Sequence, residues 1–264
     1  MSRPGLVRLA GALPLRMGAG WNRVLSLVAL LCLWQGAAIL VRDPGLLPSP
    51  AATLRAGYAE LVRGELIFHV AVTLARVAVA FALAMLIGSA IGIALGRSPA
   101  LDQIFGGWLV IGLNLPALVT IVLCYVWFGL TEVAAILAVT INKVPTVAAI
   151  VREGTKALDR SLFEMTEVFD VKPGRILARV ILPQLTPSLM GAARAGLALT
   201  WKIVLVVELL GRPNGVGFQI RTFFNYFDIA GILAYSLVFI GAVIAIETFL
   251  LQPLDRRLGR WRRA

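Results

Sequence analysis

Six stretches of about 20 apolar residues dominate this sequence, and each is long enough to cross the hydrocarbon core of a lipid bilayer. Of the 264 residues, 59% are hydrophobic and 15% are charged. A soluble domain is typically about 45–50% apolar and about 25% charged, so this composition excludes both a soluble fold and a disordered chain. The sequence therefore predicts an all-α membrane protein with six transmembrane helices, Val24–Val41, Val70–Leu95, Ile104–Trp127, Val133–Val151, Leu189–Leu210 and Ile229–Leu251.

The positive charges predict how these helices are oriented. The formal net charge is +11. Most Lys and Arg residues lie before the first run, in the connection between the fourth and fifth runs, and after the last run. Because cytoplasmic loops carry an excess of Lys and Arg, both termini are predicted to be cytoplasmic. Basic residues placed beside apolar runs indicate the lipid bilayer as a partner and no nucleic acid.

The chain reads as one membrane domain with a short leader. Segment 1–22 is a basic cytoplasmic N-terminal segment, and residues 23–264 form the transmembrane domain. The first run, Val24–Val41, is longer than the apolar core of about 7–15 residues in a signal peptide, so we interpret it as a membrane anchor. The long polar connection 152–186 faces the cytoplasm in this topology.

On the opposite side, the sequence Leu47-Pro48-Ser49-Pro50 predicts the start of another helix. Ser49 is suited to the N-cap, and Pro50 to the first helical position. Apolar and charged residues then alternate with helical spacing. This segment is expected to be an amphipathic helix on the outer surface.

Small residues and prolines punctuate the predicted spans. Gly88, Gly92 and Gly96 recur on one helical face, a spacing that allows two backbones to approach closely in lipid. Pro116 and Pro145 should each kink or break a helix, because proline removes a backbone donor. Asn114 lies close to Pro116, and Asn142 lies close to Pro145. Such breaks line the cavity in some transporters, but simple helix kinks are an equally good interpretation.

Two lysines, Lys143 and Lys202, lie well inside predicted spans. A charged side chain at the centre of a span costs about 2.5–3.5 kcal/mol on insertion scales, so each should face protein or water. Together with Asn114, Pro116 and Glu208, they are candidates for lining a pathway for an anionic solute. Alternatively, they form structural ion pairs with Glu208, Asp228 or Glu247, or they snorkel.

Two further polar residues lie nearer the ends of these runs. Arg76 is expected to snorkel, with its charged group reaching the membrane surface. His69, at the outer end of the second run, is expected at the membrane interface.

The connection between the fourth and fifth runs predicts a helix, a turn and a second helix. The first helix covers 160–169, and Asp170 begins the turn. Pro173 suits the first turn of the second helix, which is expected to end at Leu182 and Pro183. A short amphipathic hairpin in the cytoplasm has no apolar reason to form unless another protein docks on it, although a loop resting on lipid headgroups is the alternative.

This hairpin resembles the coupling loop of ABC importer permeases, a Glu-Ala-Ala sequence followed by a Gly and an Ile-x-Leu-Pro ending. The matching positions are Glu164, Met165, Thr166, Asp170, Val180, Leu182 and Pro183. Met165 and Thr166 are larger than Ala, which implies a roomier groove in the partner or a shallower seat. Asp170 replaces a Gly expected to have positive φ, and Asp is among the better substitutes there.

The resemblance extends over most of the chain and favours the nitrate, sulfonate and taurine branch of the family. The matching segments are Leu47-Pro48-Ser49-Pro50, Leu95-Gly96-Arg97-Ser98, Trp127-Phe128-Gly129-Leu130, Trp201 with Glu208-Leu209-Leu210-Gly211, Asn214-Gly215-Val216-Gly217 and Leu258-Gly259-Arg260-Trp261-Arg262. The first 22 residues match nothing in that family.

The resemblance implies a MetI-like permease of a type I ABC importer in the bacterial inner membrane. Its partners would be cytoplasmic ATP-binding subunits, a second permease copy, most simply an identical one, and an extracytoplasmic solute-binding protein. No Gly-x-x-x-x-Gly-Lys-Ser/Thr phosphate loop is present, so ATP and Mg²⁺ would belong to the partner ATPase and this chain would bind no cofactor.

Other classes of function fit less well. A channel or secondary carrier that works without ATP is the main alternative. A membrane enzyme is disfavoured, because the chain has one His and no clustered carboxylates for catalysis or for a metal.

Overall fold

The computed structural model describes residues 19–251 and 253, and every element in this part of the chain is a helix. Most of the predicted N-terminal segment 1–22 and the Arg-rich end lie outside the described residues. In chain order the helices are α1 (Ala19–Val41), α2 (Pro50–Arg63), α3 (Glu65–Arg97), α4 (Pro99–Asn114), α5 (Ala117–Phe128), α6 (Glu132–Lys156), α7 (Arg160–Val168), α8 (Pro173–Ile176), η1 (Leu177–Ile181), α9 (Leu182–Gly211), α10 (Val216–Asn225), α11 (Ile229–Ile246) and η2 (Glu247–Leu251). The two elements η1 and η2 are π-helical.

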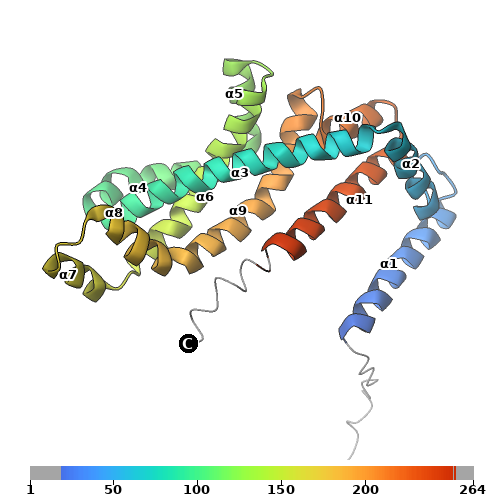
Figure 1. Ribbon diagram of the computed structural model, residues 1–264. Helices are drawn as coiled ribbons and strands as arrows, with labels where there is room; N and C mark the ends of the chain where they lie inside the picture. The colour runs from blue at the N-terminus through green and yellow to red at the C-terminus, as the bar shows by residue number, and fades with distance from the viewer. Residues whose placement is uncertain (1–18, 252, 254–264) are drawn as a thin grey trace, which may run out of the picture.

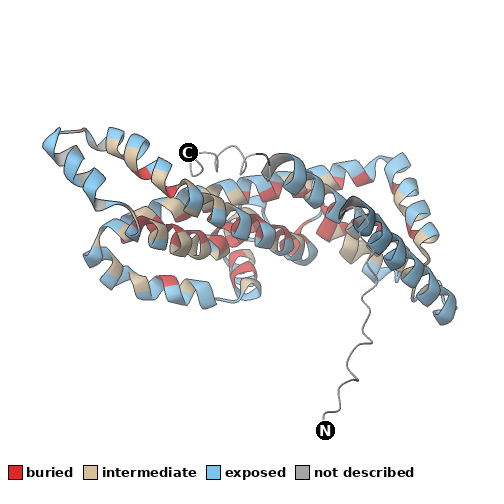
Figure 2. Cartoon of the chain, turned by 90° about the horizontal axis from the view of Figure 1, so that it is seen from below, coloured by how far each residue is buried: buried red, intermediate tan, exposed pale blue. Residues whose placement is uncertain are grey.

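The helix α3 forms the long axis of the molecule, with α6 and α9 packed against it. At one end of α3 lie α2 and α10, and at the other lie α7 and α8 (Figure 1). We call the second of these the hairpin end. Figure 2 shows the buried residues gathered along the central helices, whereas the tip of the α7 hairpin is exposed.

Five of the six predicted spans have helices that are long and apolar enough to cross a membrane. Four are single helices, α1, α3, α6 and α11 with the start of η2. The fifth is α4 together with α5, if this bent pair counts as one span. The sixth, Leu189–Leu210, lies within the 30-residue α9. This helix carries the charged residues Arg194, Lys202 and Glu208.

The backbones of α3 and α6 are in close contact along the glycine row. A Cβ atom added to Gly88 would lie 2.7 Å from Cβ of Val147, and one added to Gly92 would lie 2.7 Å from the carbonyl oxygen of Ala148. Gly96 is equally crowded, one turn further along. The expected close approach of two backbones is therefore confirmed, and its partner is α6.

The two prolines behave differently from each other. Pro116 separates α4 from α5, and the axes of these two helices differ by 96°, as expected for a break. At Pro145 the helix does not break, because α6 continues from Glu132 to Lys156; of the two expected outcomes, only a kink remains possible there. Neighbouring helices can hold a proline-containing helix together in a membrane. Here the Pro145 ring packs so closely on Gly112 of α4 that a Cβ there would lie 2.7 Å from its Cγ.

The second helix of the hairpin continues directly into α9. We expected it to end at Leu182 and Pro183, and this is wrong: α8, η1 and α9 follow one another without a break from Pro173 to Gly211. Pro183 has no N–H to donate. The preceding turn is π-helical, and the Leu182 N–H donates to the Leu177 carbonyl oxygen, five residues back. The result is one helical rod about 55 Å long.

The predicted outer helix α2 starts as the sequence indicated. Ser49 is its N-cap, with Oγ accepting from the Ala52 N–H at 3.2 Å, and Pro50 occupies the first position. The preceding helix α1 stands apart from the bundle, and none of Val24–Val41 is buried inside the chain. One hydrogen bond, from Trp34 Nε1 to the Pro48 carbonyl oxygen at 3.0 Å, links α1 to the approach to α2.

The glycine contact predicts a sharp difference between two alanine substitutions. Gly92→Ala should destabilise the fold by about 1–3 kcal/mol, because its new methyl group meets backbone atoms of α6 that cannot move aside. Gly107→Ala should be neutral or slightly stabilising, since nothing lies within 4 Å of its Cβ position. Thermal unfolding of both proteins in detergent measures the difference. Equal Tm values would contradict the packing.

Candidate functional site

The turn of the hairpin is closed by a left-handed residue. Asp170 follows α7 with φ of 46°, as expected for a position where the related motif has Gly. The Val171 N–H donates to the Thr166 carbonyl oxygen at 3.0 Å, and the Phe169 N–H to that of Met165 at 3.1 Å. A left-handed residue spanned by a six-to-one hydrogen bond is a common helix C-terminus. This position of the motif therefore requires a positive φ, which Asp adopts with some conformational strain.

The hairpin presents apolar side chains that no described part of the chain covers. Met165 is 55% exposed, Val168 80% and Phe169 72%. Glu164 is also exposed, whereas Thr166 and Val180 are partly buried. Exposed apolar groups on a cytoplasmic or lipid-adjacent hairpin mark an interaction surface.

The base of the hairpin, by contrast, is anchored in the core. Ile181 and Leu185 are fully buried and pack in one cluster with Val147 and Val151 of α6. Leu182 lies between them in the sequence, yet it is 40% exposed. The exposed apolar side chains of the hairpin are thus attached to a base that is packed into the core.

A charge cluster also fixes α4 to the end of α6 at this base. Arg152 and Lys156, in the last turns of α6, both bind Asp102 of α4. The Arg152 NH2 group lies 2.7 Å and the Lys156 Nζ 2.8 Å from Asp102 Oδ2. No local sequence pattern predicts this cluster, because Asp102 lies 50 residues before Arg152.

A second polar network lies at the opposite end, around Arg76 of α3. The Arg76 guanidinium lies 2.6 Å from Oε1 of Glu208, and its Nε donates to Glu132 at 2.9 Å. It also donates to the Asn214 carbonyl oxygen at 2.8 Å. Arg76 is 5% exposed, so the expectation that it snorkels is wrong: two carboxylates hold it inside the subunit.

Glu208 holds the turn between α9 and α10. Its side chain is completely buried, and its Oε2 accepts from Thr73 Oγ1 and from the Gly217 N–H, both at 2.9 Å. The same turn needs Gly215, which has φ of 108° and leaves no space for a Cβ beside the Glu208 carboxylate. The Asn-Gly-Val-Gly motif is explained here as a loop wrapped around a buried carboxylate.

His69 and Arg212 extend this network. His69 is 6% exposed, and its Nδ1 accepts from the Gly215 N–H at 2.9 Å. Arg212 lies 2.8 Å from Glu132. The sequence pattern indicated Glu208, but neither its partner Thr73 nor Glu132, the second carboxylate that binds Arg76. A charge-neutral pairing of Arg76 with Glu208 would have been the signal to look for.

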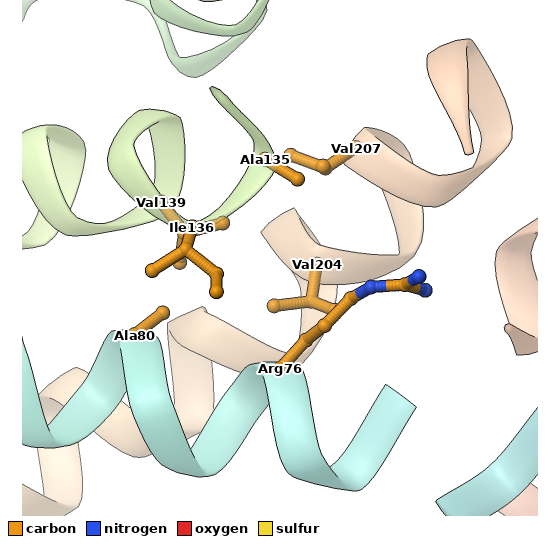
Figure 3. Close-up of a pocket in the computed structure, with 7 residues that line it drawn as sticks. All are labelled: Arg76, Ala80, Ala135, Ile136, Val139, Val204 and Val207. Carbon is orange, nitrogen blue, oxygen red and sulfur yellow. The ribbon is translucent and has the colours of Figure 1, made fainter. Parts of the chain in front are cut away.

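Figure 3 shows that the two parts of the Arg76 side chain have different surroundings. Its aliphatic stem lies beside Val204, while the guanidinium points away from Ala80, Ile136 and Val139. The gap that these side chains enclose is too small to hold a water molecule. This part of the subunit interior is packed, and a solute could not pass through it.

The remaining pathway candidates are dispersed around the bundle. Asn114 is exposed at the end of α4, where its amide donates to the Val110 carbonyl oxygen at 2.8 Å, and Pro116 follows at the break. Lys143 is 5% exposed, whereas Lys202 is exposed. Glu208 is bound by Arg76 and Asp228 caps α11. The described residues supply no ion pair to either lysine.

Four apolar helices, a bent pair that could form a fifth span, and an exposed hairpin continuous with α9 indicate a membrane-embedded subunit. Within the described residues, no group of three or more His, Cys, Asp or Glu side chains could hold a metal ion. Residues 80–260 match the family described as binding-protein-dependent transport system inner membrane component. The chain belongs to this family of ABC transporter permeases; it is a transport subunit and not an enzyme.

Named relatives place it within the family. The chain is 28% identical over 251 residues to a putative aliphatic sulfonates transport permease of Bacillus subtilis, covering 94% of this chain and 91% of that protein. It is 30% identical over 247 residues to the taurine transport system permease of Escherichia coli, covering 89% and 88%. A formylaminopyrimidine transport permease of Halalkalibacterium halodurans is 22% identical over 240 residues, covering 90% and 95%.

The fold also has a solved counterpart. A chain of the inward-facing MetNI methionine ABC transporter aligns with a TM-score of 0.65 at 20% identity, covering 75% of this chain and 98% of that chain. The expected MetI-like fold is confirmed by this match.

The buried network predicts that removing one carboxylate destabilises the subunit. In Glu208→Ala, Arg76 loses one of its two counterions and the Gly217 N–H loses its acceptor. The expected cost is about 3 kcal/mol, equivalent to a Tm lower by roughly 10 °C. Glu208→Gln keeps an acceptor in place and should lose less.

Glu153→Ala is the matched control, because Glu153 also pairs with basic residues but its side chain is 65% exposed. It should change Tm little. A Glu208→Ala protein as stable as the Glu153→Ala protein would refute the structural role of the network.

Proposed function

We propose that this chain is the permease subunit of an ATP-driven importer for a small organic anion of the sulfonate or taurine class. The observation that carries the proposal is the hairpin: its apolar side chains are exposed, its turn is fixed at Asp170, and its second helix is the start of α9. A docking surface joined rigidly to a membrane helix is suited to transmit force from a separate protein.

In the proposed topology, α9 is the fifth of six spans, and both termini face the cytoplasm. The charge pattern of the loops supports this orientation, and the rod places the hairpin and the Arg76 network at opposite ends of the subunit. The hairpin would be cytoplasmic and the network extracytoplasmic. The long polar connection 152–186 is then the coupling loop.

The partners follow from this topology. Cytoplasmic ATP-binding subunits, which hold ATP and Mg²⁺, would receive Met165, Val168 and Phe169 in surface clefts. A second copy of the chain would complete the pathway, and an extracytoplasmic solute-binding protein would deliver the solute. ATP binding would move the two hairpins together, and the spans would reorient to open outward; hydrolysis would reset them.

The relatives support an organic anion without defining one molecule. Two of the named relatives are sulfonate or taurine permeases, and one is a pyrimidine permease. A channel or carrier that works without ATP is the competing proposal. It leaves the exposed face of the hairpin without a purpose and predicts transport in the absence of any ATPase.

Substitution of Asp170 tests the coupling role. Asp170→Gly should retain ATP-dependent uptake, because Gly adopts positive φ freely. Asp170→Ile should lose most uptake, because a β-branched residue disfavours φ of 46° by about 1–2 kcal/mol and distorts the turn. Uptake and membrane abundance are measured in cells that express the whole transporter.

Arg42 provides a matched control. It has φ of 56° in the turn between α1 and α2, away from the hairpin. Arg42→Ile carries a similar backbone penalty and should leave coupling intact. Normal uptake by Asp170→Ile, or equal losses in both variants, would overturn the coupling role.

A further inference from the structure

The two lysines that the sequence placed within the spans lie at the same depth. On one side of this level, the Cβ position of Gly196 in α9 lies 3.8 Å from Val147 of α6. On the other side, Val204 of α9 and Val139 of α6 line one gap. Lys202 lies between Gly196 and Val204 in α9, and Lys143 lies between Val139 and Val147 in α6. The two contacts therefore enclose both lysines at one level.

Their environments differ sharply. Lys143 is 5% exposed and lies on the buried side of α6. Lys202 is exposed, and it lies on the face of α9 turned away from the bundle, together with Gly191, Ala195, Ala198, Leu199 and Val206. Arg194, about two turns before Lys202, is exposed as well. The buried face of the same helix carries Gly196, Thr200, Val204 and Glu208.

The face of α9 that carries Lys202 is poorly suited to contact lipid, because Lys202 is charged. Lys202 lies about 13 Å along the helix axis from Gly211, too far for its four-carbon stem to reach the end of the span. A lysine ammonium at this depth must therefore meet protein or water. The described residues offer it no hydrogen bond or ion pair, and the nearby carboxylate Glu208 is already bound by Arg76.

We propose that Lys202 contacts the anionic group of the solute, on a water-filled pathway lined by the outer face of α9 from each of two copies. This inference rests on the proposed transport function. Lys143, enclosed within each subunit at the same level, adds positive potential without touching the solute. The pathway would thus have a positive electrostatic potential at the depth of the two lysines. This potential would attract an anion but would not favour a neutral solute.

Cysteine labelling tests the position of Lys202 without knowledge of the solute. The probe is sulfonatoethyl methanethiosulfonate, a membrane-impermeant reagent that is itself an organosulfonate. The whole transporter is used in membranes, in a background with Cys124 replaced by Ala. Lys202→Cys and Lys143→Cys are each introduced after Cys32→Ala. The protein that keeps Cys32, an exposed thiol on α1, is the lipid-facing control.

Lys202→Cys should react on the order of 100-fold faster than Cys32, because hydrocarbon excludes the charged reagent from Cys32. Lys143→Cys should react as slowly as Cys32. A Lys202→Cys protein that reacts no faster than Cys32 would overturn the proposal. Faster reaction at Lys143→Cys than at Lys202→Cys would also overturn it and would move the pathway inside the subunit.

Uptake of ethanesulfonate tests the charge itself. Lys202→Arg should retain uptake, and Lys202→Met should reduce it by about tenfold or more at equal membrane abundance. Unchanged uptake in Lys202→Met would refute the contact, while the Asp170 result would still stand for the importer. If Asp170→Ile imports normally and Lys202→Cys is labelled, the ATP-coupled function fails and the anion pathway remains.

Discussion

The buried ion pair between Arg76 and Glu208 is the constraint on which the rest of this subunit depends. Both groups lie where neither water nor lipid headgroups can solvate them, so each is tolerable only beside the other. The pair joins α3 to the end of α9, and Gly217 and Thr73 complete the shell of Glu208. The position of α9 at this end is therefore fixed by electrostatics rather than by apolar packing alone.

The same three helices are fixed differently at the hairpin end. There the glycine row brings α3 against α6, and Ile181 and Leu185 tie the rod to α6. With α9 held at both ends, α3, α6 and α9 form one body. The bent pair α4 and α5 is joined to it at Asp102 and at the Pro145–Gly112 contact.

The sequence was most informative where local chemistry decides the structure. The apolar runs predicted six spans, of which four are single apolar helices and a fifth is the bent pair α4 and α5. Ser49 with Pro50 predicted the start of α2. The Gly position of the coupling motif predicted the left-handed Asp170. In each case the signal is carried by adjacent residues or by a regular spacing.

It was least informative where tertiary partners override local rules. Pro145 and Pro183 are helix breakers by propensity, but α4 supports the first and a π turn accommodates the second. Arg76 looked free to snorkel because its counterions, Glu132 and Glu208, follow it by 56 and 132 residues. No window of sequence could pair them, and the fold does so through the antiparallel course of α6 and α9.

The charges inside the bundle therefore belong to two classes with different consequences. Arg76, Glu132, Glu208 and Arg212 neutralise one another within the subunit, and such a closed set contributes shape but no net field. Lys143 and Lys202 have no such compensation among the described residues. A charged side chain without a counterion inside the membrane raises the free energy of the folded subunit. A residue with a purely structural role could be neutral and avoid this cost. Neutral side chains of similar volume could fill both positions. Under the proposed anion pathway, a solute anion beside Lys202 would offset this cost during each passage.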